Sequence, residues 1–179
     1  MTSRRTFLAA ATTTLTTAAA ALTVGGLLPL SRGAMAATAT QRTALDAALQ
    51  SSDLVYLTPL HKNGKESRCH AEVWFVQKSG VVYVVTANNA WRAKALGRGL
   101  QRAQLWVGDF GNWKSAGDRF RTAPGFTATG ARITDQKEIA SVLDLYSNKY
   151  RIQWLLWSSK FHNGLRDGTR VMLRYTREA

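Results

Sequence analysis

Apolar residues run almost without interruption through three neighbouring segments in the first half of the chain. Residues 53–60, 67–76 and 81–86 are each rich in Val, Tyr, Phe or Leu, and short polar stretches separate them. Such runs are typical of β-strands that are buried on one or both faces. Asn63-Gly64 and Lys78-Ser79-Gly80, which separate the three runs, are typical of the tight turns that join antiparallel strands. The sequence therefore predicts three consecutive antiparallel strands.

The rest of the chain alternates between helical and strand-like patterns. Helices are predicted at residues 40–51 and 91–99, from Asp135 onward, and in a second piece that contains Trp154, Leu155 and Trp157. Further strands are predicted at residues 103–109, 127–132 and 170–175. A parallel βαβ architecture is excluded, because no helix separates the first three strands. We therefore expect a mainly β (α+β) fold, a six-stranded antiparallel barrel with flanking helices.

The first 36 residues have the pattern of an export signal. Ser3-Arg4-Arg5-Thr6-Phe7-Leu8 resembles the twin-arginine (Tat) consensus, and a run rich in Ala, Thr and Leu follows it to about Leu30. Ala34-Met35-Ala36 is a small-x-small cleavage motif, so we expect removal of residues 1–36 and a mature domain of residues 37–179. The Tat machinery would then deliver a periplasmic or otherwise exported protein without a stable membrane anchor. An uncleaved anchor is the alternative, because the run is long enough to cross a bilayer.

The charge balance suggests a nucleic-acid partner at first. The chain has 24 Lys and Arg against 11 Asp and Glu, a net charge of +13, and seven basic residues with interleaved Trp106 and Trp113 lie between Arg92 and Arg121. A polyanion-binding module is therefore one alternative. The signal segment, however, accounts for three of the positive charges, and its loss leaves +10. Nucleic acid is not a normal ligand of an exported protein, so no such partner is expected.

Several kinds of site are excluded by what the sequence lacks. Cys69 is the single cysteine, so the chain has neither an internal disulfide nor a Cys-cluster zinc site or Cys-ligated iron–sulfur centre. Its three histidines show no metal-ligand spacing such as HExxH, and no nucleophile elbow, P-loop or dinucleotide fingerprint is present. The sequence therefore predicts no metal site, and it assigns no catalytic residue.

An anion site is predicted where the third strand ends. Thr86 closes that strand, and Arg92 and Lys94 lie in the first turn of the helix that follows. A hydroxyl group, two cations and the free N–H groups of a helix start are the donors that hold a phosphate. The alternative is that Arg92 and Lys94 lie on a solvated helix face.

Residues 53–107 resemble the pyridoxamine-phosphate-oxidase-like family, the flavin-binding split β-barrels. The matching segments are Leu54-Val55-Tyr56-Leu57-Thr58-Pro59-Leu60, Ser67-Arg68-Cys69-His70-Ala71-Glu72-Val73-Trp74-Phe75 and Val82-Tyr83-Val84-Val85-Thr86, continuing to Leu96. The resemblance implies a split β-barrel that binds FMN between the two subunits of a homodimer. It also implies that Thr86 and Arg92 hold the flavin phosphate. The chain departs from the family pattern at Arg92, where Lys is usual, and at Ala90, where Ser is frequent.

The family resemblance leaves the cofactor open among three possibilities. An FMN-dependent oxidoreductase acting on a small molecule is the leading hypothesis, since flavin itself supplies redox chemistry. Other members use a deazaflavin coenzyme or bind haem, for which His70 or His162 would be the axial ligand. A split barrel that binds a ligand without any cofactor is a further alternative.

Other candidates come from side-chain spacing and from the same resemblance. Arg68 and His70 are two apart in a predicted strand, so we expect them to share a face, near the flavin or in solvent, while Cys69 points into the core. We expect Trp106, Trp113, Trp154 and Trp157 to serve packing rather than cofactor binding. The candidate cofactor-binding set is Arg68, His70, Thr86, Trp91, Arg92 and Lys94.

Overall fold

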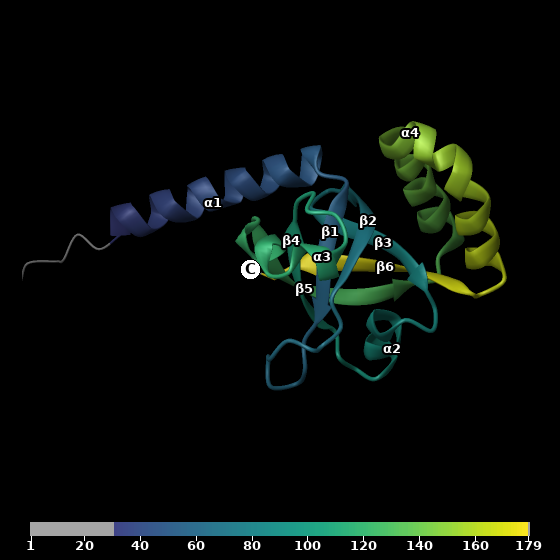
Figure 1. The fold of residues 1–179 in the computed structure, drawn as a ribbon, viewed down its shortest axis with the longest axis horizontal. Helices are drawn as coiled ribbons and strands as arrows, with labels where there is room; N and C mark the ends of the chain where they lie inside the picture. Colours follow the sequence, from purple (N-terminus) through teal and green to yellow (C-terminus); the bar gives the residue numbers. More distant parts are fainter. Residues whose placement is uncertain (1–30, 179) are drawn as a thin grey trace, which may run out of the picture.

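Six antiparallel strands close into one barrel, and helices lie around its outside (Figure 1). The computed structural model describes residues 31–178, and their side chains from residue 39 onward. In chain order the elements are α1 (Ser31–Ser51), β1 (Leu54–Pro59), β2 (Ala71–Lys78), β3 (Val81–Ala87), α2 (Trp91–Gly97), β4 (Arg102–Val107), α3 (Trp113–Ala116), the 3-10 helix η1 (Arg119–Thr122), β5 (Gly125–Ile133), α4 (Gln136–Arg166) and β6 (Arg170–Arg177).

The strands follow the order β1-β2-β3-β6-β5-β4 around the barrel, and each neighbouring pair is antiparallel. This confirms the predicted six-stranded antiparallel barrel with flanking helices. The pairing of β3 with β6 places Ala87 opposite Arg170. The end of β3 and the start of β6 therefore lie side by side, although more than 80 residues separate them in the chain.

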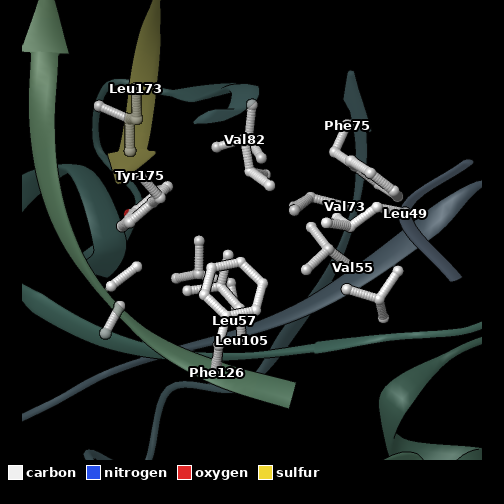
Figure 2. Close-up of a cluster of buried hydrophobic side chains, with 14 of the residues drawn as sticks. Leu49, Val55, Leu57, Val73, Phe75, Val82, Leu105, Phe126, Leu173 and Tyr175 are labelled. Carbon is white, nitrogen blue, oxygen red and sulfur yellow. The ribbon is translucent and has the colours of Figure 1, made fainter. Parts of the chain in front are cut away.

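Alternate residues of the strands fill the barrel interior, as the period of a β-strand requires. Figure 2 shows their side chains converging from all around the barrel. Leu57, Phe75 and Leu105 are fully buried there, and Leu49 of α1 belongs to the same cluster. This tightly filled interior leaves the ligand-sized spaces on the outer surface of the barrel.

Helix α4 forms a second apolar layer outside the barrel. Non-helical backbone angles at Arg151 divide it into two segments, which confirms the two helical pieces that the sequence predicts. Figure 1 shows the two segments side by side. Tyr150 attaches α4 to β2, because its hydroxyl donates to the carbonyl oxygen of Phe75 at 2.7 Å and accepts from the Phe75 N–H at 2.9 Å. These two hydrogen bonds therefore fix the position and orientation of α4 against β2.

Two predicted boundaries are wrong in ways that matter for function. Strand β2 begins at Ala71 rather than at residue 67, because Leu60 and Glu66 form an isolated bridge and residues 67–70 leave the ladder. Helix α1 begins at Ser31 rather than at Thr40, and the intervening sequence, rich in Ala, favours helix.

The predicted signal segment is described only from residue 31, so its first 30 residues lie outside the described chain. Within residues 31–178, none of the helices has the length and apolarity needed to span a membrane.

Candidate functional site

A cavity of about 380 Å³ lies between the barrel and α4. Strands β2, β3 and β6, helix α2 and the second segment of α4 all contribute to it. Its lining residues are Val73, Trp74, Val85, Thr86, Ala87, Arg92, Trp157, Phe161 and Arg170. The structure thus brings Thr86 and Arg92 together, as the sequence predicts, and adds an aromatic wall and a second arginine.

Two polar atoms of this cavity are buried without a hydrogen-bond partner among the described residues: Thr86 Oγ1 and Arg92 Nε. Thr86 is 2% exposed, and burial lowers the pKa of the Arg92 guanidinium below its ordinary value. An unsatisfied buried donor or acceptor costs about 1–3 kcal/mol, so folded proteins rarely keep two of them in residues that line one cavity. A ligand that accepts hydrogen bonds from both groups would remove this cost.

Helix α2 contributes its side chains to the site rather than its end. It has only seven residues, and its N-cap residue Ala90 makes no side-chain capping bond. The side chain of Asn88 does not cap the helix either, because its amide donates to Gly168 O and accepts from Arg132. The hydrogen-bond donors that this point of the cavity offers are therefore the side chains of Thr86 and Arg92 more than free helix N–H groups.

Cys69 touches Arg92 instead of pointing into the core. Its half-buried sulfur interacts with the guanidinium and the backbone of Arg92. Burial raises the pKa of the thiol, and the positive charge of Arg92 opposes that shift. The expected core position is wrong because residues 67–70 form a loop, in which the alternation of a strand does not apply.

Aromatic rings form one wall of the cavity. Trp74 stacks on Tyr150 with ring centroids 4.6 Å apart, and Trp157 meets Trp74 edge-on at 6.1 Å. Trp154 is buried, which confirms its predicted packing role, whereas Trp157 is 38% exposed and lines the cavity. The packing role expected for Trp157 is therefore incomplete. Helical spacing identifies two neighbouring tryptophans, but it does not reveal that the barrel leaves a space beside one of them.

The remaining predicted candidates lie outside this cavity. Lys94 is exposed on α2. Arg68 and Trp91 line a separate depression of about 470 Å³ together with His61, Ser67 and Cys69. The strand face that Arg68 and His70 were expected to share does not form, since both residues precede β2.

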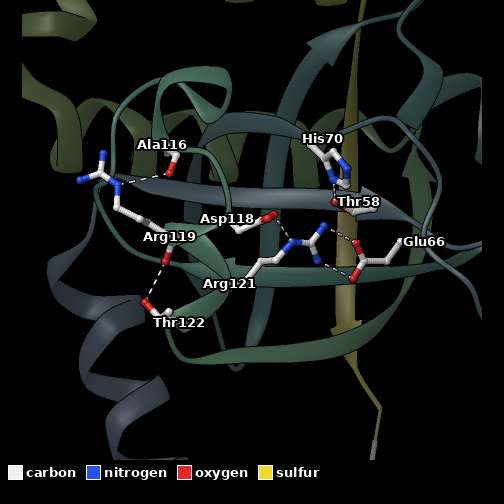
Figure 3. A network of polar contacts seen from close by, with 8 residues as sticks. All are labelled: Thr58, Glu66, His70, Ala116, Asp118, Arg119, Arg121 and Thr122. Carbon is white, nitrogen blue, oxygen red and sulfur yellow. Dashed lines mark hydrogen bonds and ion pairs between the residues drawn. The ribbon is translucent and has the colours of Figure 1, made fainter.

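His70 lies in a packed polar and aromatic cluster, which we call the His70 cluster (Thr58, Glu66, His70, Trp113, Asp118, Phe120 and Arg121). Its Nδ1 atom is 2.7 Å from Thr58 Oγ1, and its ring contacts Trp113 and Phe120. Arg121 pairs there with Glu66 at 2.7 Å and with Asp118 at 3.0 Å (Figure 3). Trp106 and Trp113 both pack around these rings within the chain, and their expected role in dimer packing stays a prediction.

Comparisons with known proteins establish the fold. Neither a family model nor a curated protein sequence matches this chain. A protein of unknown function from Agrobacterium tumefaciens, Atu2129, has a similar structure, with a TM-score of 0.55 and 15% identity over 86% of this chain and 60% of that one. A 5-nitroimidazole antibiotic resistance protein from Bacteroides thetaiotaomicron, itself described as putative, gives a TM-score of 0.54 at 9% identity, covering 77% and 80%. The haem storage protein HutZ from Vibrio cholerae gives 0.51 at 13% identity, covering 78% and 91%. The chain is therefore a split β-barrel with flanking helices.

Proposed function

We propose that this chain is an exported oxidoreductase that holds the phosphate of a flavin, FMN or a deazaflavin coenzyme, in the Thr86–Arg92 cavity. The observation that carries the proposal is the pair of unpartnered buried atoms, Thr86 Oγ1 and Arg92 Nε, beside an aromatic wall. A phosphate oxygen accepts from both groups, and Arg offers a forked, charge-assisted contact. When bound, the flavin supplies hydride or electron transfer, and the chain supplies binding, orientation and exclusion of water.

The cavity also suits the ring system of such a ligand. Its volume, about 380 Å³, falls in the range of roughly 300–1,000 Å³ that is typical of small-molecule sites. Trp74, Trp157 and Phe161 provide apolar and aromatic surface for a planar ring. We therefore expect the ring to pack near these residues and the phosphate to lie at Thr86 and Arg92.

A haem ligand fits the described residues less well. HutZ is a haem storage protein, so haem is a reasonable alternative for this fold. The two histidines considered as axial ligands lie elsewhere, since His70 is in the His70 cluster and His162 packs beside Trp154 and lines a different depression. The polyanion hypothesis is weakened too: Arg92 is half-buried in the cavity, and Arg102 and Arg121 are paired with acidic side chains.

The homodimer and the export route are parts of the same proposal. Ile152, Leu155 and Leu156 form an apolar stripe on α4 that is 74–79% exposed, and Trp157 connects this stripe to the cavity. A second copy of the chain packed on the stripe would bury it and would also close the cavity. The Tat resemblance supports export of a protein that has already folded around its cofactor.

The visible spectrum of the full-length protein, purified from a Tat-competent host, tests the proposal. We expect a flavin band near ~450 nm, or one near ~420 nm for a deazaflavin, while a sharp Soret band would identify haem. The apoprotein should bind FMN at least tenfold more tightly than riboflavin, because riboflavin lacks the phosphate that Thr86 and Arg92 would hold. A colourless protein that binds neither flavin would refute the proposal, and equal affinities would refute the phosphate site.

A further inference from the structure

Arg170 lies where two cavities meet. It lines the Thr86–Arg92 cavity and also a wider depression of about 600 Å³. Ala87, Asn88, Asn89, Gly168 and Thr169 complete that wider depression. Arg92, in contrast, lines only the inner cavity. The two arginines therefore face different parts of one continuous surface.

The protein holds the Arg170 side chain in place by a specific packing arrangement. Its guanidinium carbon lies 5.4 Å from the centroid of the Phe161 ring. Its aliphatic part passes Gly164 so closely that a Cβ atom on this glycine would lie 2.7 Å from both Cγ and Cδ of Arg170. Because Gly164 is buried in α4, only the missing side chain at this position leaves room for the arginine. The position of Arg170 is thus built by two residues of α4.

No carboxylate neutralises Arg170 among the described residues. The ion pairs of residues 39–178 involve Arg102, Arg121 and Arg174, and neither cavity that Arg170 lines contains an Asp or a Glu. The surrounding groups are instead asparagines, threonines, aromatic rings and the second cation, Arg92. A fixed guanidinium with no acidic neighbour is a recognition group for an anion.

We infer that Arg170 binds the anionic group of the substrate, and that the substrate is a small planar carboxylic acid. The Phe161 and Trp157 rings beside it favour a planar molecule, and the forked guanidinium favours a carboxylate. That the bound acid is a substrate rests on the proposed flavin function. The anion site itself does not, because Arg170 also lines the wider depression, to which Arg92 does not contribute.

Benzoate and its neutral analogue benzamide provide a matched pair of probes. Their binding to the full-length protein is measured by quenching of tryptophan fluorescence, with and without saturating FMN, since Trp74 and Trp157 line the site. We expect at least tenfold tighter binding of benzoate than of benzamide. Arg170→Gln should reduce the preference to within twofold, and Arg177→Gln, an exposed arginine of the same strand, should retain it.

Gly164→Ala provides a second route to the same test. It leaves Arg170 in the chain but displaces its stem, so the benzoate preference should fall while the fold, followed by circular dichroism, persists. An unchanged preference in both Arg170→Gln and Gly164→Ala would overturn the inference. So would a loss of FMN affinity in Arg170→Gln as large as that in Arg92→Met, with benzoate binding intact. A benzoate preference that depends on Arg170 in a protein unable to bind FMN would support the anion site and refute the flavin proposal alone.

Discussion

One short loop connects two regions that use similar residues in opposite ways. In residues 67–70, Cys69 contacts Arg92 on one side and His70 contacts Thr58 on the other. Each region contains a buried threonine, an arginine and aromatic rings. In the His70 cluster the threonine and the arginine are paired, whereas in the cavity Thr86 Oγ1 and Arg92 Nε are not. It is this difference in unsatisfied polar atoms, more than in residue types, on which we base the proposal that the cavity binds a ligand while the His70 cluster is structural.

Replacing Arg92 or Arg121 by methionine should give the largest difference between the cavity and the His70 cluster. Arg92→Met should lower FMN affinity about 10- to 100-fold, the equivalent of losing a charge-assisted contact of about 1.5–3 kcal/mol. It should change the melting temperature little, because among the described residues the guanidinium forms no ion pair and loses only its contact with Cys69. FMN titration and thermal unfolding measure the two effects.

Arg121→Met is the matched control for this substitution. It should leave FMN affinity unchanged but destabilise the protein by about 1 kcal/mol, since it breaks partly exposed ion pairs to Glu66 and Asp118. If both variants behaved alike in either measurement, the distinction between a binding region and a structural region would fail.

The two buried threonines allow a subtler exchange, because valine has almost the shape of threonine without its hydroxyl. Thr86→Val should stabilise the protein by about 1 kcal/mol in urea unfolding, since it removes a buried hydroxyl that has no partner, and should weaken FMN binding several-fold. Thr58→Val should destabilise by about 1 kcal/mol, because His70 loses its hydrogen-bond partner, and should leave FMN binding unchanged. Equal stability changes in the two variants would contradict our assignment of the unpartnered hydroxyl.

The sequence predicts the barrel and the phosphate pair because both depend on neighbouring residues. Period-two alternation and hairpin turns define the strands locally. Thr86 and Arg92 are six residues apart, on a strand end and the helix that follows, so their proximity needs no knowledge of topology. Whether these residues bind a cofactor stays a prediction.

The rest of the site depends on contacts between distant segments. Arg170 joins it only because β6 pairs with β3, and Trp157 only because α4 folds back onto β2. Arg68 and His70 illustrate a second limit. A few residues that leave the ladder after Leu60 remove the regular alternation, and the predicted face disappears with it. Neither effect has a signal in local sequence spacing.

Lowering the pH should destabilise the folded protein through His70, by less than the substitutions described above. Burial and the charge of Arg121 lower the pKa of His70 below its ordinary value, so the unfolded chain takes up the proton more readily than the folded one. Stability is therefore complete above the unfolded pKa of about 6.5 and falls as the pH decreases below it. In urea unfolding at about pH 7 and about pH 5, His70→Gln should lose less stability on acidification than the unmodified protein. His61→Gln, on the exposed hairpin, is the control, and an identical pH dependence in all three proteins would contradict this expectation.

Replacing Lys94 should have the smallest effect on FMN affinity. It is also the position at which the sequence prediction and the structure disagree. Sequence spacing places Lys94 with Arg92 at the phosphate, whereas in the structure its side chain is exposed and outside the cavity lining. Solvent screens a charge in that position, so Lys94→Ala should weaken FMN binding by less than about threefold, under 1 kcal/mol. Raising the salt concentration should remove even this difference, while the loss in Arg92→Met should persist. A tenfold loss in Lys94→Ala would instead mean that α2 moves on binding and brings both cations to the phosphate.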